Sequence, residues 1–119
     1  MLLDTSGLLC LHHKGELFHQ QACECYRAAH RRLTNNYVLA EFIVLATVRR
    51  LPRQAMLAFM VDLLRNPDIE VIWVNELLDS EAMDLLSKRQ DKAYSLCDAV
   101  SFILMRQRGI RCLAFGTIL

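Results

Sequence analysis

The amino-acid sequence predicts an α/β fold in which a short, mostly parallel central sheet is flanked by helices on both faces. Short apolar segments of the kind found in buried strands alternate with longer segments of helical periodicity. The clearest strand spans residues 70–74 and is rich in β-branched and aromatic side chains. The chain has 119 residues, 54% of them hydrophobic and 23% charged. We therefore expect one domain over residues 1–119, with a real core.

The first half of the chain gives two strands and two helices. Residues 2–4 form a very short buried strand, and a helix follows to about residue 12, with Thr5 or Ser6 as its cap. An amphipathic helix spans about residues 16–30. Residues 31–34 then form a short edge strand or the second strand of the sheet.

The helices of the middle segment have clear boundary residues. Asn35 and Asn36 start a helix over about residues 37–50, which is apolar almost all round and is therefore predicted to be central. Pro52 suits the first turn of a helix that ends near residue 65. Residues 66–68 form a turn that leads into the strand at residues 70–74.

The last third is predicted to hold two helices and a strand. The helices span about residues 75–89 and 95–108, and Gly109 ends the second one as a left-handed residue. Residues 111–115 form a final apolar strand. Strands separated by helices in this way place ligands at the carboxyl ends of the strands, which is where Asp4 lies.

Composition limits the cellular setting. The net charge of +1 gives no whole-molecule attraction for a polyanion, so any nucleic-acid contact must come from a local patch. No stretch has the roughly 18 apolar residues of a membrane helix, and the start lacks the basic region of a signal peptide. The five cysteines form no CxxC pair, which favours reduced, mostly buried thiols in a cytoplasmic protein over a zinc or disulfide site.

Three carboxylates stand among apolar neighbours in the sequence, where an ionised side chain is unfavourable: Asp4, Glu41 and Asp98. An ionised carboxylate taken out of water costs several kcal/mol unless a partner or a metal compensates it. The arginines cluster at helix ends and in loops, so they are not obvious partners. The three acids therefore suggest a shared cation, and a hard divalent metal prefers such oxygen ligands.

Simpler roles remain open for each acid. Asp4 could cap the helix that follows it, and Asp98 fits a capping box with Ser95. Glu41 is the only charged residue between Tyr37 and Ala46, so a purely structural role would need a distant arginine. A capping role and a ligand role are compatible, because a carboxylate has two oxygens.

Other functional signals are weaker. The chain shows no supported Ser/His/Asp arrangement and no glycine-rich phosphate loop. A phospho-acceptor domain with an acidic pocket lacks the expected lysine and threonine. A basic cluster next to a turn is either a solvated face or, if RNA binds, the first candidate for phosphate contacts; it comprises Arg49, Arg50 and Arg53.

The ordered motifs resemble those of the PIN-domain family, in the style of the VapC-type ribonuclease toxins of bacterial toxin–antitoxin pairs. Four segments carry the resemblance, in the family's order and spacing: residues 2–6 (Leu-Leu-Asp-Thr-Ser), 19–22 (His-Gln-Gln-Ala), 38–41 (Val-Leu-Ala-Glu) and 95–99 (Ser-Leu-Cys-Asp-Ala). The resemblance implies a three-layer α/β/α fold and a Mg²⁺- or Mn²⁺-dependent endoribonuclease that hydrolyses RNA phosphodiester bonds.

The resemblance also implies roles and partners. Asp4 and Asp98 would be the principal metal ligands, Glu41 a ligand or a residue that orients water, and Ser6 a weaker outer candidate. The partners would be RNA, a small antitoxin protein and a second copy of the chain. Gly116 stands where the family usually carries another acid, and the C-terminal edge is short. An alternative is therefore a catalytically weak or inactive PIN-like module that acts by protein association.

Overall fold

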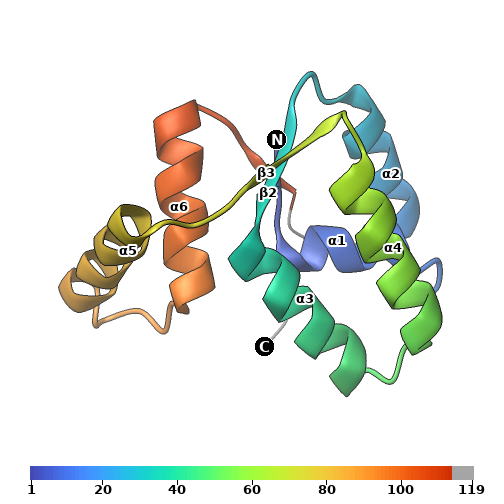
Figure 1. Ribbon diagram of the computed structural model, residues 1–119, viewed down its shortest axis with the longest axis horizontal. Helices are drawn as coiled ribbons and strands as arrows, with labels where there is room; N and C mark the ends of the chain where they lie inside the picture. Colours follow the sequence, from blue (N-terminus) through green and yellow to red (C-terminus); the bar gives the residue numbers. More distant parts are fainter. Residues whose placement is uncertain (114–119) are drawn as a thin grey trace.

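The computed structural model describes residues 1–113, which form a parallel sheet of four short strands and six helices. The strands lie in the order β3-β2-β1-β4, and their bounds are Leu2–Leu3 (β1), Arg32–Asn35 (β2), Ile69–Ile72 (β3) and Cys112–Leu113 (β4). All three pairings are parallel, so the four carboxyl ends meet at one edge of the sheet. Figure 1 shows the sheet between two groups of helices.

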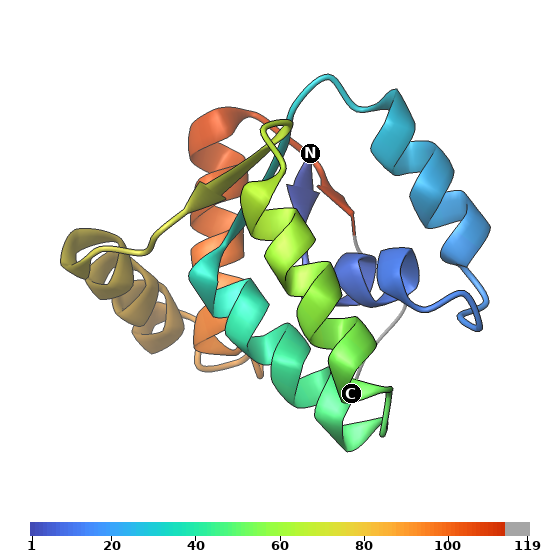
Figure 2. The same ribbon diagram turned by 45° about the vertical axis from the view of Figure 1, so that its right-hand side comes forward.

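The helices cover both faces of the sheet, as Figures 1 and 2 show from two directions. Leu3 of β1 shares a core with four helices: α1 (Thr5–His12), α2 (His19–Ala28), α3 (Asn36–Val48) and α4 (Arg53–Arg65). Leu2 and Leu33 pack instead with α5 (Glu76–Lys88) and α6 (Leu96–Arg108). Neighbouring residues of a strand point to opposite faces, so Leu2 and Leu3 enter different cores. The predicted three-layer α/β/α architecture is confirmed.

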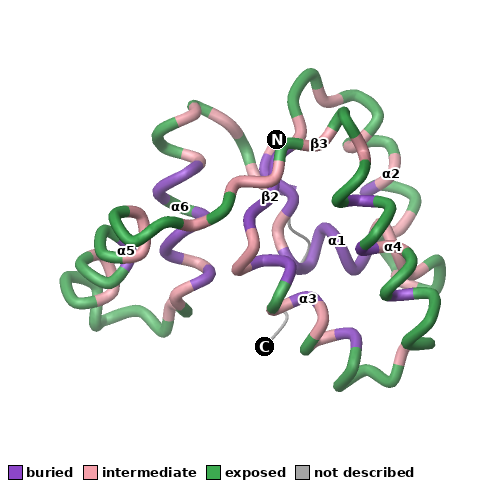
Figure 3. Tube along the Cα trace, viewed as in Figure 1, coloured by how far each residue is buried: buried purple, intermediate pink, exposed green. Residues whose placement is uncertain are grey.

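The predicted burial of α3 is wrong. We expected a central helix, but its outer side is open, with Val44 61% and Val48 72% exposed. Its inner side holds Val38, Phe42 and Ala46 in the core. Figure 3 shows this division along the helix. Apolar side chains all round a helix therefore do not mark a central position here, because one side has no neighbour among residues 1–113.

Several boundaries also differ from the prediction. The segment at residues 32–35 lies inside the sheet, whereas the strand with the strongest sequence signal, β3, lies at the outer position of the described sheet. The second helix is shorter than expected, from His19 to Ala28. Asp4, and neither Thr5 nor Ser6, is the cap residue of α1. The end of the predicted last strand and Gly116 lie outside the described residues.

A close backbone contact holds the start of α1 against β4. A Cβ atom added to Gly7 would stand 2.1 Å from the carbonyl oxygen of Leu113, far inside van der Waals contact. The Asp4 N–H donates to the same carbonyl at 3.4 Å. Gly7 therefore lets the helix approach the strand and fixes Asp4 at the edge of the sheet.

The C-terminal end of α6 lies where the sequence predicts it. Gly109 ends α6 with φ of 62°, the left-handed conformation expected there.

None of the helices among residues 1–113 has the length and apolar character needed to cross a bilayer.

Candidate active site

Asp4 stands at the carboxyl end of β1, where the chain turns into α1. Its backbone is extended, and its side chain forms no capping hydrogen bond with the helix. The carboxylate accepts a hydrogen bond from the Thr5 N–H and is half-buried. The capping alternative for the Asp4 side chain is therefore not what the structure shows, and a different role for this carboxylate is open.

Asp98 does form the predicted capping box at the start of α6. The Ser95 hydroxyl accepts from the Asp98 N–H at 3.0 Å, and Oδ2 of Asp98 accepts from the Ser95 N–H at 2.9 Å. The box engages one carboxylate oxygen and fixes the orientation of the side chain. The second oxygen has no hydrogen bond to another described residue. Capping thus positions the Asp98 side chain and engages only one of its two carboxylate oxygens.

Glu41 lies on the second turn of α3 and is half-buried. Its negative charge is among the causes that raise the pKa of the Cys97 thiol on α6. The ion pairs among residues 1–113 use other acids, namely Glu16, Glu70 and Asp91. Within that part of the chain, no arginine or lysine neutralises Asp4, Glu41 or Asp98, so the alternative of a distant arginine partner for Glu41 finds no support.

The three carboxylates share one electrostatic neighbourhood. Burial raises the pKa of Asp4 above its ordinary value, and the negative charges of Asp98 and Glu41 raise it further. The Thr5 N–H and the Cys112 thiol act in the opposite direction, because both donate to the ionised carboxylate. Asp98 of α6 and Glu41 of α3 therefore lie within electrostatic reach of Asp4 at the end of β1, although the three are far apart in sequence.

Two thiols complete this neighbourhood, and the sequence alone did not indicate them. Cys97 on α6 is buried and lies within electrostatic reach of Glu41, and Cys112 on β4 lies within electrostatic reach of Asp4. Burial and the Asp4 charge raise the pKa of Cys112 to about 12. Burial and the charges of Glu41, Asp4 and Asp98 likewise raise the pKa of Cys97. Strand order was the missing information, since Cys112 reaches Asp4 only because β4 pairs with β1.

Two buried hydroxyl groups near these acids in sequence have no hydrogen-bond partner among residues 1–113. The Thr5 hydroxyl follows Asp4 directly, and the Ser101 hydroxyl lies one helical turn after Asp98. Asn35 is fully buried and caps α3 through Oδ1, while its Nδ2 finds no partner in the described part of the chain. Because Leu2 pairs with Leu33, Asn35 lies beside Asp4 at the carboxyl edge of the sheet. From the sequence, Asn35 is predicted only to start a helix.

The donor set fits a hard divalent cation by its chemistry. Three carboxylates that form no ion pair with a described residue, together with the polar atoms that lack partners there, have the chemistry that such an ion would satisfy. Among residues 1–113, however, no group of three or more His, Cys, Asp or Glu side chains is arranged as a preformed metal site. An ion would therefore draw these side chains closer together.

Ser6 and the basic cluster lie at different distances from this neighbourhood. Ser6 is buried in the first turn of α1, two residues after Asp4. Arg49, Arg50 and Arg53 lie at the connection between α3 and α4, and Arg49 pairs with Glu16 at 2.5 Å. Eight residues of helix separate Glu41 from Arg49, about 12 Å along the axis. The cluster is thus outside the carboxylate neighbourhood.

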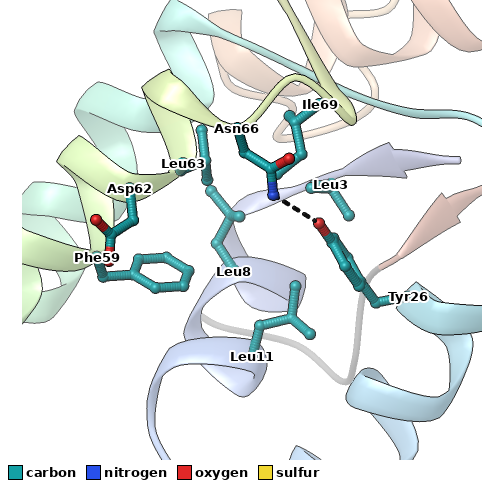
Figure 4. Close-up of a pocket in the computed structure, with 9 residues that line it drawn as sticks. All are labelled: Leu3, Leu8, Leu11, Tyr26, Phe59, Asp62, Leu63, Asn66 and Ile69. Atoms are coloured by element: carbon teal, nitrogen blue, oxygen red, sulfur yellow. Dashed lines mark hydrogen bonds between the residues drawn. The ribbon is translucent and has the colours of Figure 1, made fainter.

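A pocket of about 250 Å³ lies elsewhere in the molecule. It is mostly apolar, and Figure 4 shows its polar atoms at the Tyr26 hydroxyl, which accepts from Asn66 at 3.4 Å, and at Asp62. Its walls come from α1, α2 and α4, together with Leu3 of β1, Asn66 after α4 and Ile69 of β3. Asp4, Glu41 and Asp98, together called the acid cluster here, do not line it. This pocket is therefore separate from the three carboxylates.

Solved structures share the fold. Mycobacterium tuberculosis VapC20, described as a toxin that cleaves the sarcin–ricin loop, superposes with a TM-score of 0.85 at 29% sequence identity, covering 97% of this chain and 88% of VapC20. A toxin–antitoxin complex from Klebsiella pneumoniae gives a TM-score of 0.61 at 15% identity, covering 93% of this chain and 82% of the other, and shows the fold alone.

Sequence comparisons give one assignment. No curated protein matches the chain. The family model of the PIN domain matches residues 1–119. Together with the three-layer fold, this match shows that the chain belongs to the PIN-domain family.

Proposed function

We propose that this chain is a Mg²⁺- or Mn²⁺-dependent endoribonuclease, the toxin of a VapBC-type toxin–antitoxin pair. The observation that carries the proposal is that Glu41 and Asp98 lie within electrostatic reach of Asp4, with no ion pair to any of the three among residues 1–113. Membership of the PIN family and the likeness to VapC20 support nuclease chemistry at the level of the family.

The residues of the site have distinct tasks in this proposal. Asp4 and Asp98 hold the ion, and Glu41 serves as a third ligand or orients a water molecule. The Ser95 N–H orients Asp98, the Thr5 N–H orients Asp4, and the Ser6 hydroxyl supports the site from outside the ligand set. A bound divalent ion lowers the pKa of a water molecule and stabilises the charge that develops on the phosphate.

RNA phosphates would be held apart from the acids, which repel them. Arg50 and Arg53 are exposed beyond the end of α3 and are the best placed of the basic cluster. Arg49 contributes less, because Glu16 already shares its charge. We propose these side chains as sequence-independent phosphate contacts.

A protein partner is supported by an apolar stripe on α4. Leu57, Val61 and Leu64 follow one another at helical spacing and are each more than two-fifths exposed. Such a stripe needs a cover in a soluble complex. The toxin–antitoxin complex that shares this fold makes an antitoxin segment our proposed partner, with a second copy of the chain as another. We propose a cytoplasmic location, where RNA and such partners meet.

Cleavage of RNA tests the activity directly. A labelled sarcin–ricin loop oligonucleotide and an unrelated RNA hairpin are incubated with the protein in Mn²⁺ or Mg²⁺. We expect cleavage that stops with EDTA and in Asp98→Asn, while Asp84→Asn, which alters an exposed acid on α5, retains it. Undiminished cleavage by Asp98→Asn would remove Asp98 from the mechanism.

A non-catalytic interaction module is the second candidate. It is favoured by Gly116 in the position of an expected acid and by the absence of a preformed metal group in residues 1–113. It predicts a folded protein that binds a partner. This protein would cleave neither the sarcin–ricin loop oligonucleotide nor the hairpin, whether Mn²⁺ or Mg²⁺ is present.

A further inference from the structure

His19 begins α2, and its ring is held by the end of α1. Nδ1 of His19 lies 2.7 Å from the carbonyl oxygen of Cys10. Cys10 stands in the last turn of α1, where carbonyl groups have no N–H of the same helix to accept from. A carbonyl oxygen can only accept a hydrogen bond, so Nδ1 carries the proton and donates it. Nε2 of the neutral ring is therefore the acceptor.

A cysteine thiol lies next to this second ring nitrogen. Cys23 follows His19 by one turn of α2, and its sulfur is 3.7 Å from Nε2. Because Nε2 accepts, the thiol S–H is the donor of this hydrogen bond. A nucleophile, a base within hydrogen-bond reach and a third group that orients the base are the three parts of an activated nucleophile. Cys23, His19 and the Cys10 carbonyl supply them, and the proposed ribonuclease mechanism uses none of the three.

The surroundings favour transfer of the thiol proton to His19. The carbonyl groups at the end of a helix carry partial negative charge, which stabilises a cation beside them. An imidazolium at His19 keeps its hydrogen bond to Cys10 at the end of α1 and gains this stabilisation. Arg27 lies one turn after Cys23 on the same face of α2 and places a positive charge on the thiolate side of the pair.

Cys23 is also within reach of a small reagent. Its side chain is half-buried on α2, whereas Cys10 and Cys97 are buried. Oxidation of cysteine follows the thiolate character and the exposure of the sulfur, and its first product is a sulfenic acid. Hydroperoxides are small neutral oxidants, so they suit a half-buried sulfur that has a base beside it.

We propose that Cys23 is a modification site that hydroperoxides oxidise to a sulfenic acid, with His19 as the base. Nε2 of His19 takes the thiol proton as the sulfur attacks one oxygen of the peroxide. An S–O bond forms and the O–O bond breaks, so the sulfur loses two electrons and the peroxide gains them. The departing oxygen takes the proton from His19 and leaves as water or an alcohol. The step needs neither RNA nor a metal ion and is independent of the proposed function.

Cys25 is a control within the same molecule. It is exposed on α2, and among residues 1–113 its thiol hydrogen-bonds no histidine. Both cysteines adjoin Glu24, so they share an acidic neighbour in the sequence. Exposure alone predicts that Cys25 is oxidised faster, whereas activation by His19 predicts that Cys23 is oxidised faster. The two explanations therefore give opposite orders of reaction.

Trapping of the sulfenic acid measures this order. The reduced full-length protein is treated with dilute hydrogen peroxide and dimedone, which captures sulfenic acids, and tandem mass spectrometry assigns the adduct to Cys23 or Cys25. We expect Cys23 to react at least about 10-fold faster than Cys25 in the folded protein, and the two to react at similar rates in urea. Equal or faster reaction of Cys25 in the folded protein, or a preference for Cys23 that persists in urea, overturns the inference.

Two variants test the base. His19→Asn keeps an N–H for the Cys10 carbonyl but offers Cys23 no ring nitrogen, so the rate at Cys23 should fall about 10-fold while that at Cys25 stays the same. His30→Gln changes an exposed histidine beyond the end of α2 and should react like the unmodified protein. An undiminished rate at Cys23 in His19→Asn overturns the inference. If circular dichroism shows that His19→Asn does not fold, the comparison of folded and urea-unfolded unmodified protein decides.

Discussion

Asp4 at the end of β1 lies within electrostatic reach of Asp98 in the first turn of α6, and the charge of Asp98 raises the pKa of Asp4. The parallel sheet makes this possible, because it gathers the carboxyl ends of its strands at one edge, beside the start of α6. Neither acid is paired with a cation among residues 1–113. The repulsion between them is thus a property of the fold that a bound ion would relieve.

The raised pKa of Asp4 predicts a pH-dependent stability for the metal-free protein. The folded state holds the Asp4 proton more tightly than the unfolded chain, whose aspartates titrate near pH 4 (about 3.9). Stability therefore falls as pH rises from that value through the folded pKa, and stays lower above it. In EDTA, Asp4→Asn should raise the Tm by a few degrees at pH 7.5 and by little at pH 4.

Thermal unfolding followed by circular dichroism between pH 4 and pH 8 measures this effect. Asp84→Asn is the control and should give a Tm difference that does not change across the range, because its side chain is exposed. A lower Tm for Asp4→Asn at pH 7.5 would mean that the Asp4 charge stabilises the fold.

The capping box predicts that one helix cap affects both stability and the site. Ser95→Ala removes the hydroxyl that accepts a hydrogen bond from the Asp98 N–H. This loss should cost about 1 kcal/mol of stability. It also loosens the carboxylate that the box orients, so affinity for Mn²⁺ should fall about 10-fold. Denaturant unfolding and calorimetry measure the two effects.

A second cap separates the two effects. Asn75 caps α5 in the same way, accepting the Leu78 N–H at 2.8 Å, but it lies outside the acid cluster. Asn75→Ala should cost a similar amount of stability and leave Mn²⁺ binding unchanged. Equal losses of affinity in both variants would show that the effect comes from general destabilisation.

Gly7 predicts a local packing requirement. In Gly7→Ala the new methyl group would overlap the Leu113 carbonyl, which is backbone and cannot move aside easily. We expect a loss of about 1–3 kcal/mol in urea unfolding. Gly15→Ala is the control, since its added Cβ meets the end of the flexible His13 side chain at 2.9 Å. A Gly7→Ala protein as stable as the control would contradict the close approach of α1 to β4.

Local patterns were sufficient for much of the fold. The alternation of strands and helices, the capping box at Ser95 and the left-handed Gly109 each depend on a few neighbouring residues, and each is confirmed. The exposure of Val44 and Val48 was not predictable, because it depends on which helices lack a neighbour. Burial is a tertiary property that an apolar pattern only approximates.

Some residues of the candidate site can likewise be identified from the sequence, and others cannot. Asp4, Glu41 and Asp98 attract notice in the sequence because charge stands among apolar neighbours. The thiols do not, since Cys112 becomes significant only when β4 pairs with β1. Strand order is set by long-range contacts, so the position of these thiols near the acids could be found only from the structure.

Binding of Mn²⁺ to the full-length protein, measured by isothermal titration calorimetry at pH 7.5, tests most directly whether the three acids form one site. We predict that the unmodified protein and Asp84→Asn bind the ion alike. Asp4→Asn, Glu41→Gln and Asp98→Asn should each weaken binding at least about 10-fold, because each removes a ligand or its orientation. Unchanged affinity in Glu41→Gln or in either aspartate variant would contradict a shared cation site.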